Sequence, residues 1–124
     1  MELTESLERY LGAAAALLEE EGRARVCDVA ERLGVKMPSV VRAMGKLVAL
    51  GMLRRERYGT AALTAAGRRA AASVAQRQEV LAAALRKMGV GDRAARRDAC
   101  RMARGASPET VKRLQAFAAP SRKR

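Results

Sequence analysis

The chain has 124 residues, of which 49% are hydrophobic and 2% aromatic, and this length forms one domain or two small domains that share a core. A composition rich in alanine and poor in aromatic residues argues against a β-sandwich and favours packed helices. The 25 Lys and Arg residues outnumber the 13 Asp and Glu residues, and the formal charge of +12 indicates a polyanionic partner, usually nucleic acid. A basic protein without such a partner is the plainer alternative.

Acidic and basic residues are unevenly distributed along the chain. Residues 1–31 contain eight acids and three bases, whereas residues 32–124 contain five acids and 22 bases. The acidic start has no apolar leader segment, and Ala13–Leu18 is too short to cross a bilayer. Cys27 and Cys100 are isolated cysteines, which is typical of a reducing compartment. The sequence therefore predicts a cytoplasmic protein with no membrane partner.

The first predicted helix begins after Thr4 and runs to Glu21. Thr4 can cap the helix, and the acidic residues that follow it suit the first turn because of the helix dipole. Apolar residues then recur at helical spacing, and Gly22 supplies a C-terminal stop. Residues 23–26 are expected to form a short extended link.

Two helices joined by a short glycine turn are predicted next. Asp28–Leu33 is a short amphipathic helix that Gly34 closes, and Pro38 suits the first turn of the next helix because no N–H is needed there. The apolar residues of this second helix would face a core: Val40, Met44, Leu47 and Val48. This arrangement predicts a helix-turn-helix, with an ordinary helical hairpin bearing a solvated charged face as the alternative.

The polar residues of the second helix fall on one face, because Ser39, Arg42 and Lys46 are spaced at i, i+3 and i+7. Gly51 ends this helix. Met52–Thr64 then predicts a small hairpin, with a basic strand, a turn at Tyr58-Gly59 and a short return strand. A hairpin directly after a recognition helix is the wing of a winged helix.

Within this winged helix we assign two kinds of DNA contact. Base readout is predicted for Ser39, Arg42 and the preceding turn of Lys36, Met37 and Pro38. Contacts to the DNA backbone are predicted for Lys46, Arg55, Arg57 and Thr60.

The remaining residues predict three further helices. Thr64 can cap a long helix that runs to about Met88, and Gly89 and Gly91 interrupt it. The apolar side of the long helix is formed by Val74, Leu81 and Leu85. Asp92 is expected to cap a second helix that ends near Arg104, and Ser107 to open a third that ends at Phe117.

Taken in order, these segments resemble the diphtheria-toxin-repressor family of iron- and manganese-dependent transcriptional regulators. The matching segments are Leu3–Leu11, Val26–Val35, Pro38–Val40, Arg57–Gly59, Leu63–Gly67, Asp98–Arg101 and Ala106–Thr110. Each is weak alone, but together they cover nearly the whole chain. The chain also stops where the shorter, manganese-type branch of the family stops.

The resemblance implies a mainly α fold and a division of the chain. A winged helix-turn-helix DNA-binding domain is expected at residues 1–70, a helical dimerisation domain at residues 71–119 and a basic disordered tail at residues 120–124. The implied function is transcriptional regulation, most often repression, by a homodimer on a palindromic operator in double-stranded DNA.

The family's metal site is where this sequence departs from the resemblance. The positions at which the family places metal ligands carry Arg9, Gly12, Gln78, Cys100, Ala103 and Arg104, and the chain contains no histidine. Transition-metal sites are built from imidazole, carboxylate and thiolate groups, and a guanidinium is always charged and cannot ligate. We therefore expect no metal cofactor, and we expect Cys100 to be a small apolar residue in the core.

Three other hypotheses remain open. A weak manganese or iron site could use Cys100 with Glu5, Glu8, Glu79 or Asp98. The chain could instead serve as the dimerisation partner of a metal-sensing relative. Arg9 and Arg104 could also replace the metal by pairing with those carboxylates across the helices. An enzyme is not expected, because the sequence lacks a nucleophile with a base partner and a glycine-rich phosphate loop.

Overall fold

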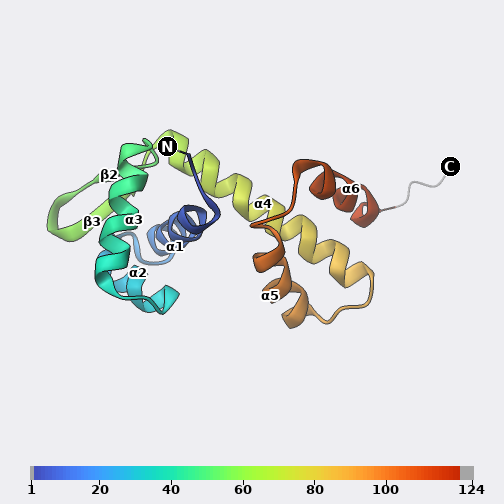
Figure 1. Ribbon diagram of the computed structural model, residues 1–124. Helices are drawn as coiled ribbons and strands as arrows, with labels where there is room; N and C mark the ends of the chain where they lie inside the picture. The colour runs from blue at the N-terminus through green and yellow to red at the C-terminus, as the bar shows by residue number, and fades with distance from the viewer. Residues whose placement is uncertain (1, 121–124) are drawn as a thin grey trace. The chain divides into compact units, whose positions relative to one another are not determined.

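The computed structural model describes residues 2–120, and the chain divides into two compact units, Met1–Ser73 and Val74–Arg124. Most of the described residues are helical, with one small sheet, as Figure 1 shows. The predicted fold class, a mainly α winged helix followed by a helical region, is confirmed. One long helix, α4 (Ala65–Lys87), contributes residues to both units.

Helix α1 (Glu5–Glu21) has the ends that the sequence predicts. The Thr4 hydroxyl accepts a hydrogen bond from the Leu7 amide at 3.2 Å, which satisfies a donor that the first turn leaves free. Gly22 takes the left-handed conformation with φ 80°, which a glycine adopts without steric cost. The apolar face of α1 is buried at Leu7, Leu11, Ala13, Ala14 and Leu17.

The helix-turn-helix consists of α2 (Val26–Leu33) and α3 (Met37–Ala49). Helix α2 begins two residues before the predicted Asp28, since Val26 and Cys27 already belong to it. Gly34 makes the turn with φ 66°, and Pro38 lies in the first turn of α3. The predicted apolar face of α3 is confirmed by burial of Val40, Met44 and Leu47, while Val48 is half-buried.

The sheet has three antiparallel strands in the order β1-β3-β2. The predicted hairpin is formed by β2 (Leu53–Arg55) and β3 (Thr60–Leu63), with Leu53 opposite Leu63. Between them lies a short 3-10 turn, η1 (Arg57–Gly59). The expected extended link is also a strand, β1 (Ala24–Arg25), in which Ala24 pairs with Ala61 of β3. The sequence had not indicated this pairing.

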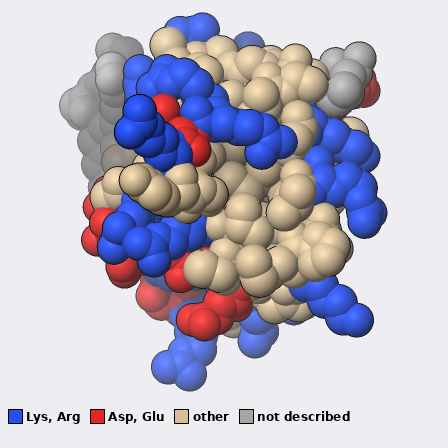
Figure 2. Space-filling view, turned by 90° about the vertical axis from the view of Figure 1, so that its left-hand side faces the viewer, with Lys and Arg blue, Asp and Glu red and all other residues tan. Residues whose placement is uncertain are grey.

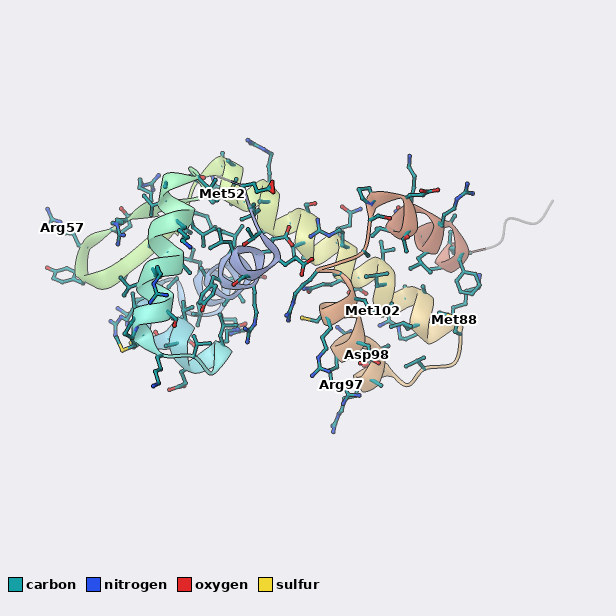
Figure 3. All side chains as sticks on the ribbon, in the orientation of Figure 1. Met52, Arg57, Met88, Arg97, Asp98 and Met102 are labelled. Carbon is teal, nitrogen blue, oxygen red and sulfur yellow. The ribbon has the colours of Figure 1, made fainter. Side chains whose placement is uncertain are left out.

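The segment after α3 is tied to the start of α4 by Thr64 and Gly67. The Thr64 hydroxyl donates to the carbonyls of Gly51 and Met52 and accepts from the Gly67 amide at 3.0 Å, so Thr64 caps α4 as predicted. A Cβ at Gly67 would lie 1.9 Å from the Met52 carbonyl oxygen, which no side chain can tolerate. Met52 lies at the base of the hairpin, beside the start of α4 (Figure 3).

In the second unit, the last part of α4 packs with α5 (Asp92–Met102) and α6 (Pro108–Ala118). Its core is small and consists of Leu81, Ala82, Ala99 and Ala103, with Leu85 and Leu114 packed against it. The alanines allow close approach of the helices. Lys87 lies over the Phe117 ring at 4.7 Å from its centroid and donates to the Phe117 carbonyl, which ties the end of α4 to α6.

Two details of this unit differ from the sequence prediction. Asp92 does not cap α5: Gly91 occupies that position, and the Asp92 carboxylate pairs with Arg86 at 3.4 Å and with Arg96 at 3.3 Å. Helix α5 ends at Met102, before the predicted Arg104. The cap of α6 is confirmed, because Ser107 accepts from the Thr110 amide at 3.2 Å.

The predicted disordered tail, apart from Pro120, lies outside the described residues. No helix in residues 2–120 is long and apolar enough to cross a membrane.

Candidate nucleic-acid interface

The face of α3 opposite the core carries the predicted reading residues. The side chains of Lys36, Met37, Pro38, Arg42 and Lys46 are exposed, and that of Ser39 is half-exposed. Helical spacing places Pro38, Ser39, Arg42 and Lys46 on the side of α3 away from its buried residues. Lys36 and Met37 are exposed at the N-terminal end of the helix. The residues predicted from α3 are therefore accessible, and four of them share one side of the helix.

Two further residues of the first unit are exposed that were not predicted as contacts. Val41 is 48% exposed, although it is apolar and follows the buried Val40. Val41 lies next to Val40 and three residues before Met44, so helical spacing alone gives no clear signal of its exposure. Tyr58, at the hairpin tip, is 90% exposed. An exposed valine can contact a thymine methyl group, and an exposed tyrosine can donate to phosphate.

The hairpin of the first unit also carries exposed arginines. The Arg55 guanidinium passes close to Gly45 of α3, since a Cβ added at Gly45 would lie 3.4 Å from its Nη2 atom. Arg57 extends from the hairpin tip into solvent (Figure 3). Arg54 is weakly engaged with Glu56 at 3.8 Å. Arg55 and Arg57 therefore lie where the sequence prediction requires exposed cations.

Thr60 has a different environment from the other predicted contacts. Its hydroxyl donates to the Arg57 carbonyl at 2.8 Å, and its amide also reaches that carbonyl. Tyr58 in this turn has φ 61° and Gly59 has φ 68°, so both take the left-handed conformation. Because its hydroxyl donates to the Arg57 carbonyl, Thr60 shapes the turn that presents Arg57 and Tyr58. Its predicted contact with the DNA backbone stays a prediction.

The helices behind α3 are held by polar contacts as well as by the core. Arg32 of α2 makes a two-pronged contact with Glu20 of α1, at 3.0 Å and 3.1 Å. The hydrogen bond and charge of Arg32 lower the pKa of the Glu20 carboxyl below its ordinary value.

Figure 2 views the molecule from the hairpin side and shows basic side chains bordering a largely uncharged surface, with acidic side chains gathered at the lower left.

The positions of the family's metal ligands do not form a site of the family's kind in the described residues. In the first unit, Arg9 is exposed and donates to the Leu33 carbonyl at 3.1 Å. In the second unit, the Gln78 amide nitrogen lies 3.7 Å from the Cys100 sulfur, and Ala103 is buried. Within residues 2–120, no three His, Cys, Asp or Glu side chains are grouped so that they could hold a metal ion. One thiol beside an amide is a poor donor set for manganese or iron.

Two of the four carboxylates expected to bridge to Arg9 and Arg104 pair with other arginines. Glu79 pairs with Arg86 at 3.4 Å, and Asp98 pairs with its neighbour Arg97 at 3.6 Å. Cys100 is half-buried, whereas Cys27 is exposed. The expected burial of Cys100 is therefore confirmed only in part.

Comparisons with known proteins match both halves of the chain. The N-terminal DNA-binding domain of the iron-dependent repressors matches residues 2–61, and their metal-binding and dimerisation domain matches residues 64–122. The transcriptional regulator MntR of Escherichia coli O6:H1 is 32% identical over 113 residues, which are 91% of this chain and 73% of that protein. The regulator MntR of Shouchella clausii is 39% identical over 89 residues, covering 72% and 62%.

Solved structures agree with this result. The chain matches T. acidophilum IdeR with a TM-score of 0.74 and 28% identity, covering 86% of this chain and 51% of that one, so it spans about half of that structure. The manganese regulator SloR matches with a TM-score of 0.76 and 21% identity over 94% of this chain and 54% of its own, which supports the fold alone. Proteins of this kind are transcriptional regulators, not enzymes. The chain therefore belongs to the iron-dependent repressor family of DNA-binding transcriptional regulators.

Proposed function

We propose that this protein is a sequence-specific repressor that binds a palindromic operator as a homodimer and does so without a metal ion. The observation that carries the proposal is a contrast within one chain. The outer face of α3 keeps its cations exposed and its core side buried, whereas the metal positions have lost imidazole and carboxylate groups.

The proposed contacts follow from the surface of the first unit. Ser39, Arg42 and the turn of Lys36, Met37 and Pro38 read base edges, because the N-terminal part of a recognition helix enters the major groove. Arg42 can make two parallel hydrogen bonds to a guanine. Lys46, Arg55 and Arg57 bind phosphate, and Thr60 supports the turn that carries Arg57.

Metal independence is supported by the donor chemistry at the family's ligand positions. Arg9 and Arg104 carry permanent positive charge, and cations repel a divalent ion. The Gln78 amide donates a weak hydrogen bond to the Cys100 sulfur, where the family's proteins would have two metal ligands. A regulator without an activating ion must hold its DNA-binding arrangement with its own contacts.

Dimerisation is supported by the apolar surface of the second unit. Met88 and Met102 are 56% and 43% exposed, although the core of this unit is small. Figure 3 shows these two methionines in the second unit, Met88 directly after α4 and Met102 at the end of α5. A second copy of the chain would bury such side chains, and two-fold symmetry would match two operator half-sites.

The test is operator selection from random duplexes, followed by binding measurements in chelator and with added manganese or iron. We expect a palindromic consensus and the same affinity in both conditions. Binding that requires manganese would overturn metal independence and favour a weak site at Cys100. Absence of any sequence preference would overturn the repressor proposal and favour a dimerisation partner of another regulator.

A further inference from the structure

The positive charge of this chain is concentrated in the unit that the family uses for dimerisation. Residues 74–124 contain 13 Lys and Arg and four Asp and Glu, whereas residues 1–73 contain 12 Lys and Arg and nine Asp and Glu. A DNA-binding protein needs its excess cations where phosphate lies. The distribution therefore requires an explanation that the recognition helix does not provide.

Three arginines of α5 form a stripe along the outside of the helix. Arg93, Arg97 and Arg101 are spaced at i, i+4 and i+8, and all three are exposed. The opposite side of the helix is the packed side, where Ala95, Ala99 and Ala103 are buried. At a rise of about 1.5 Å per residue, the stripe is about 12 Å long. We call Arg93, Arg97 and Arg101 the α5 arginine stripe.

The α5 arginine stripe does not help the helix to fold. Like charges at i, i+4 each cost a helix about 0.2–0.5 kcal/mol, and a cation near a helix N-terminus, such as Arg93, opposes the dipole. Within residues 2–120, Arg93 and Arg101 make no ion pair or side-chain hydrogen bond, and Arg97 has only its exposed contact with Asp98 at 3.6 Å. Arg97 extends from α5 into solvent (Figure 3). These guanidiniums are available to an external anion.

We propose that the α5 arginine stripe is a second, sequence-independent binding site for the phosphate backbone of double-stranded DNA. Phosphates are spaced closely along a duplex, one charge per about 1.7 Å of axis, so a stripe about 12 Å long can engage several of them. Guanidinium groups bind phosphate oxygens with paired hydrogen bonds. Exposed arginines on one rigid helix face also need no folding step to reach the backbone.

Two other occupants are less consistent with the surface. A second copy of this chain that packed stripe against stripe would place six arginines together, because a two-fold interface brings the same patch against itself. The small, arginine-only stripe also lacks the bulky apolar anchors that hold a protein on a membrane. An acidic protein segment remains as an outcome of the test.

The experiment measures the affinity of the full-length protein for a duplex without operator sequence at 50–200 mM salt. The variant Arg93→Gln/Arg97→Gln/Arg101→Gln removes the stripe and keeps good helix formers. We expect the slope of log affinity against log salt to decrease by about 2–3 per bound protomer, since each phosphate contact contributes about 0.9. The ratio of wild-type to variant affinity should then shrink about 40-fold across this salt range.

Two further variants separate the stripe from general charge. Arg93→Lys/Arg97→Lys/Arg101→Lys keeps the charges and should keep most of the slope. Arg23→Gln/Lys112→Gln/Arg113→Gln removes the same number of exposed charges elsewhere and should change the slope by much less. Circular dichroism and light scattering check the fold and assembly of each variant. Single Arg→Gln variants, each expected to lower the slope by about 0.9, replace the triple variant if it does not fold.

Several results would overturn the proposal. The first is an unchanged salt slope in the glutamine variant, and the second is an equal decrease of the slope in the control variant. The third is binding of poly-glutamate that depends on the stripe while duplex binding is unchanged, which would indicate an acidic protein partner. Operator discrimination is measured in the same titrations. A wild-type protein without discrimination contradicts the proposed repressor function, whereas the salt slope alone decides the role of the stripe.

Discussion

The two units of this chain use different means to stay folded. Among the described residues, the first unit buries a cluster of 14 apolar residues drawn from three helices and the sheet. The second unit buries a cluster of four, three of them alanines, and leaves Met88, Met102 and Phe117 exposed. Buried apolar area is the main favourable term in folding. The second unit therefore gains less from burial than the first, and the proposed homodimer would add to it.

The two units also differ in how their charge is used. In the first unit, exposed Lys and Arg side chains lie on α3 and on the hairpin, and Glu20 of α1 pairs with Arg32 of α2. In the second unit, cations exceed acids more than threefold and line α5. Under the proposed function, the core of the first unit supports the surface that reads DNA, and the second unit supplies further positive charge and the dimer contacts.

Leu47→Ala should have the largest effect on stability. Leu47 is fully buried in α3, so removal of its side chain leaves a cavity directly behind the reading face. We expect a loss of about 2–5 kcal/mol in the free energy of unfolding, measured by urea denaturation. Val41→Ala on the exposed side of α3 is the control and should change stability by less than about 0.5 kcal/mol. Equal losses in both variants would contradict the assignment of the two faces.

Leu81→Ala tests the small core of the second unit. Leu81 is fully buried among alanines, and we expect a loss of about 2 kcal/mol, at the lower end for a leucine. Because assembly and folding of this unit should be coupled, the loss in thermal midpoint should grow as the protein is diluted. Thermal melts over a hundredfold range of concentration measure this. A midpoint that does not depend on concentration would show that the second unit folds without a partner copy.

Gly67→Ala should destabilise the junction between the hairpin and α4. The added Cβ would collide with the Met52 carbonyl, so we expect a loss of about 1–3 kcal/mol and weaker DNA binding as the hairpin shifts. Gly12→Ala is the matched control. Gly12 lies inside α1 with no atom within 4 Å of an added Cβ, so this change should stabilise the protein by about 0.5–1 kcal/mol. A stabilised Gly67→Ala variant would contradict the close contact.

Arg42→Ala should weaken operator binding by about 1–3 kcal/mol and relax the sequence preference, because Arg42 is assigned to base readout. Arg57→Ala, at the hairpin tip, should weaken operator and unrelated duplexes about equally, because it is assigned to phosphate. Competition binding with both duplexes measures the difference. If Arg42→Ala kept full discrimination, the reading face would be assigned to the wrong side of α3.

Glu20→Gln should have the smallest effect. The pKa of Glu20 is lowered by Arg32, so the carboxylate stabilises the folded state above its unfolded pKa, and this contribution is lost as the pH falls through the folded pKa. We expect a slightly lower thermal midpoint for the variant at pH 7 and a difference from wild type that shrinks as the pH falls below about 4.3, the ordinary pKa of a glutamate. Glu19→Gln, the exposed neighbour, is the control. A difference that persisted in acid would show that the ion pair is not its cause.

The surfaces of α3 and the hairpin show which features helical spacing predicts and which it does not. The exposure of Arg42 and Lys46 and the burial of Val40, Met44 and Leu47 follow from helical spacing alone, and both were predicted. The exposure of Val41 was not predicted, because an apolar residue beside a buried one carries no signal of its own side. The environment of Thr60 was also missed, since its contact with the Arg57 carbonyl depends on the shape of the turn.

The sequence by itself determined the elements whose signals lie within a few residues. Thr4, Gly22, Pro38 and Ser107 mark helix ends through caps and backbone preferences, and these act locally. Tertiary structure decided what depends on residues far apart in the chain: the pairing of Ala24 with Ala61, the contact of Gly67 with Met52, and the capture of Asp92 by Arg86. A two-residue strand has no pattern to detect, and a carboxylate next to a helix start caps the helix or binds an arginine according to which group packing brings within reach.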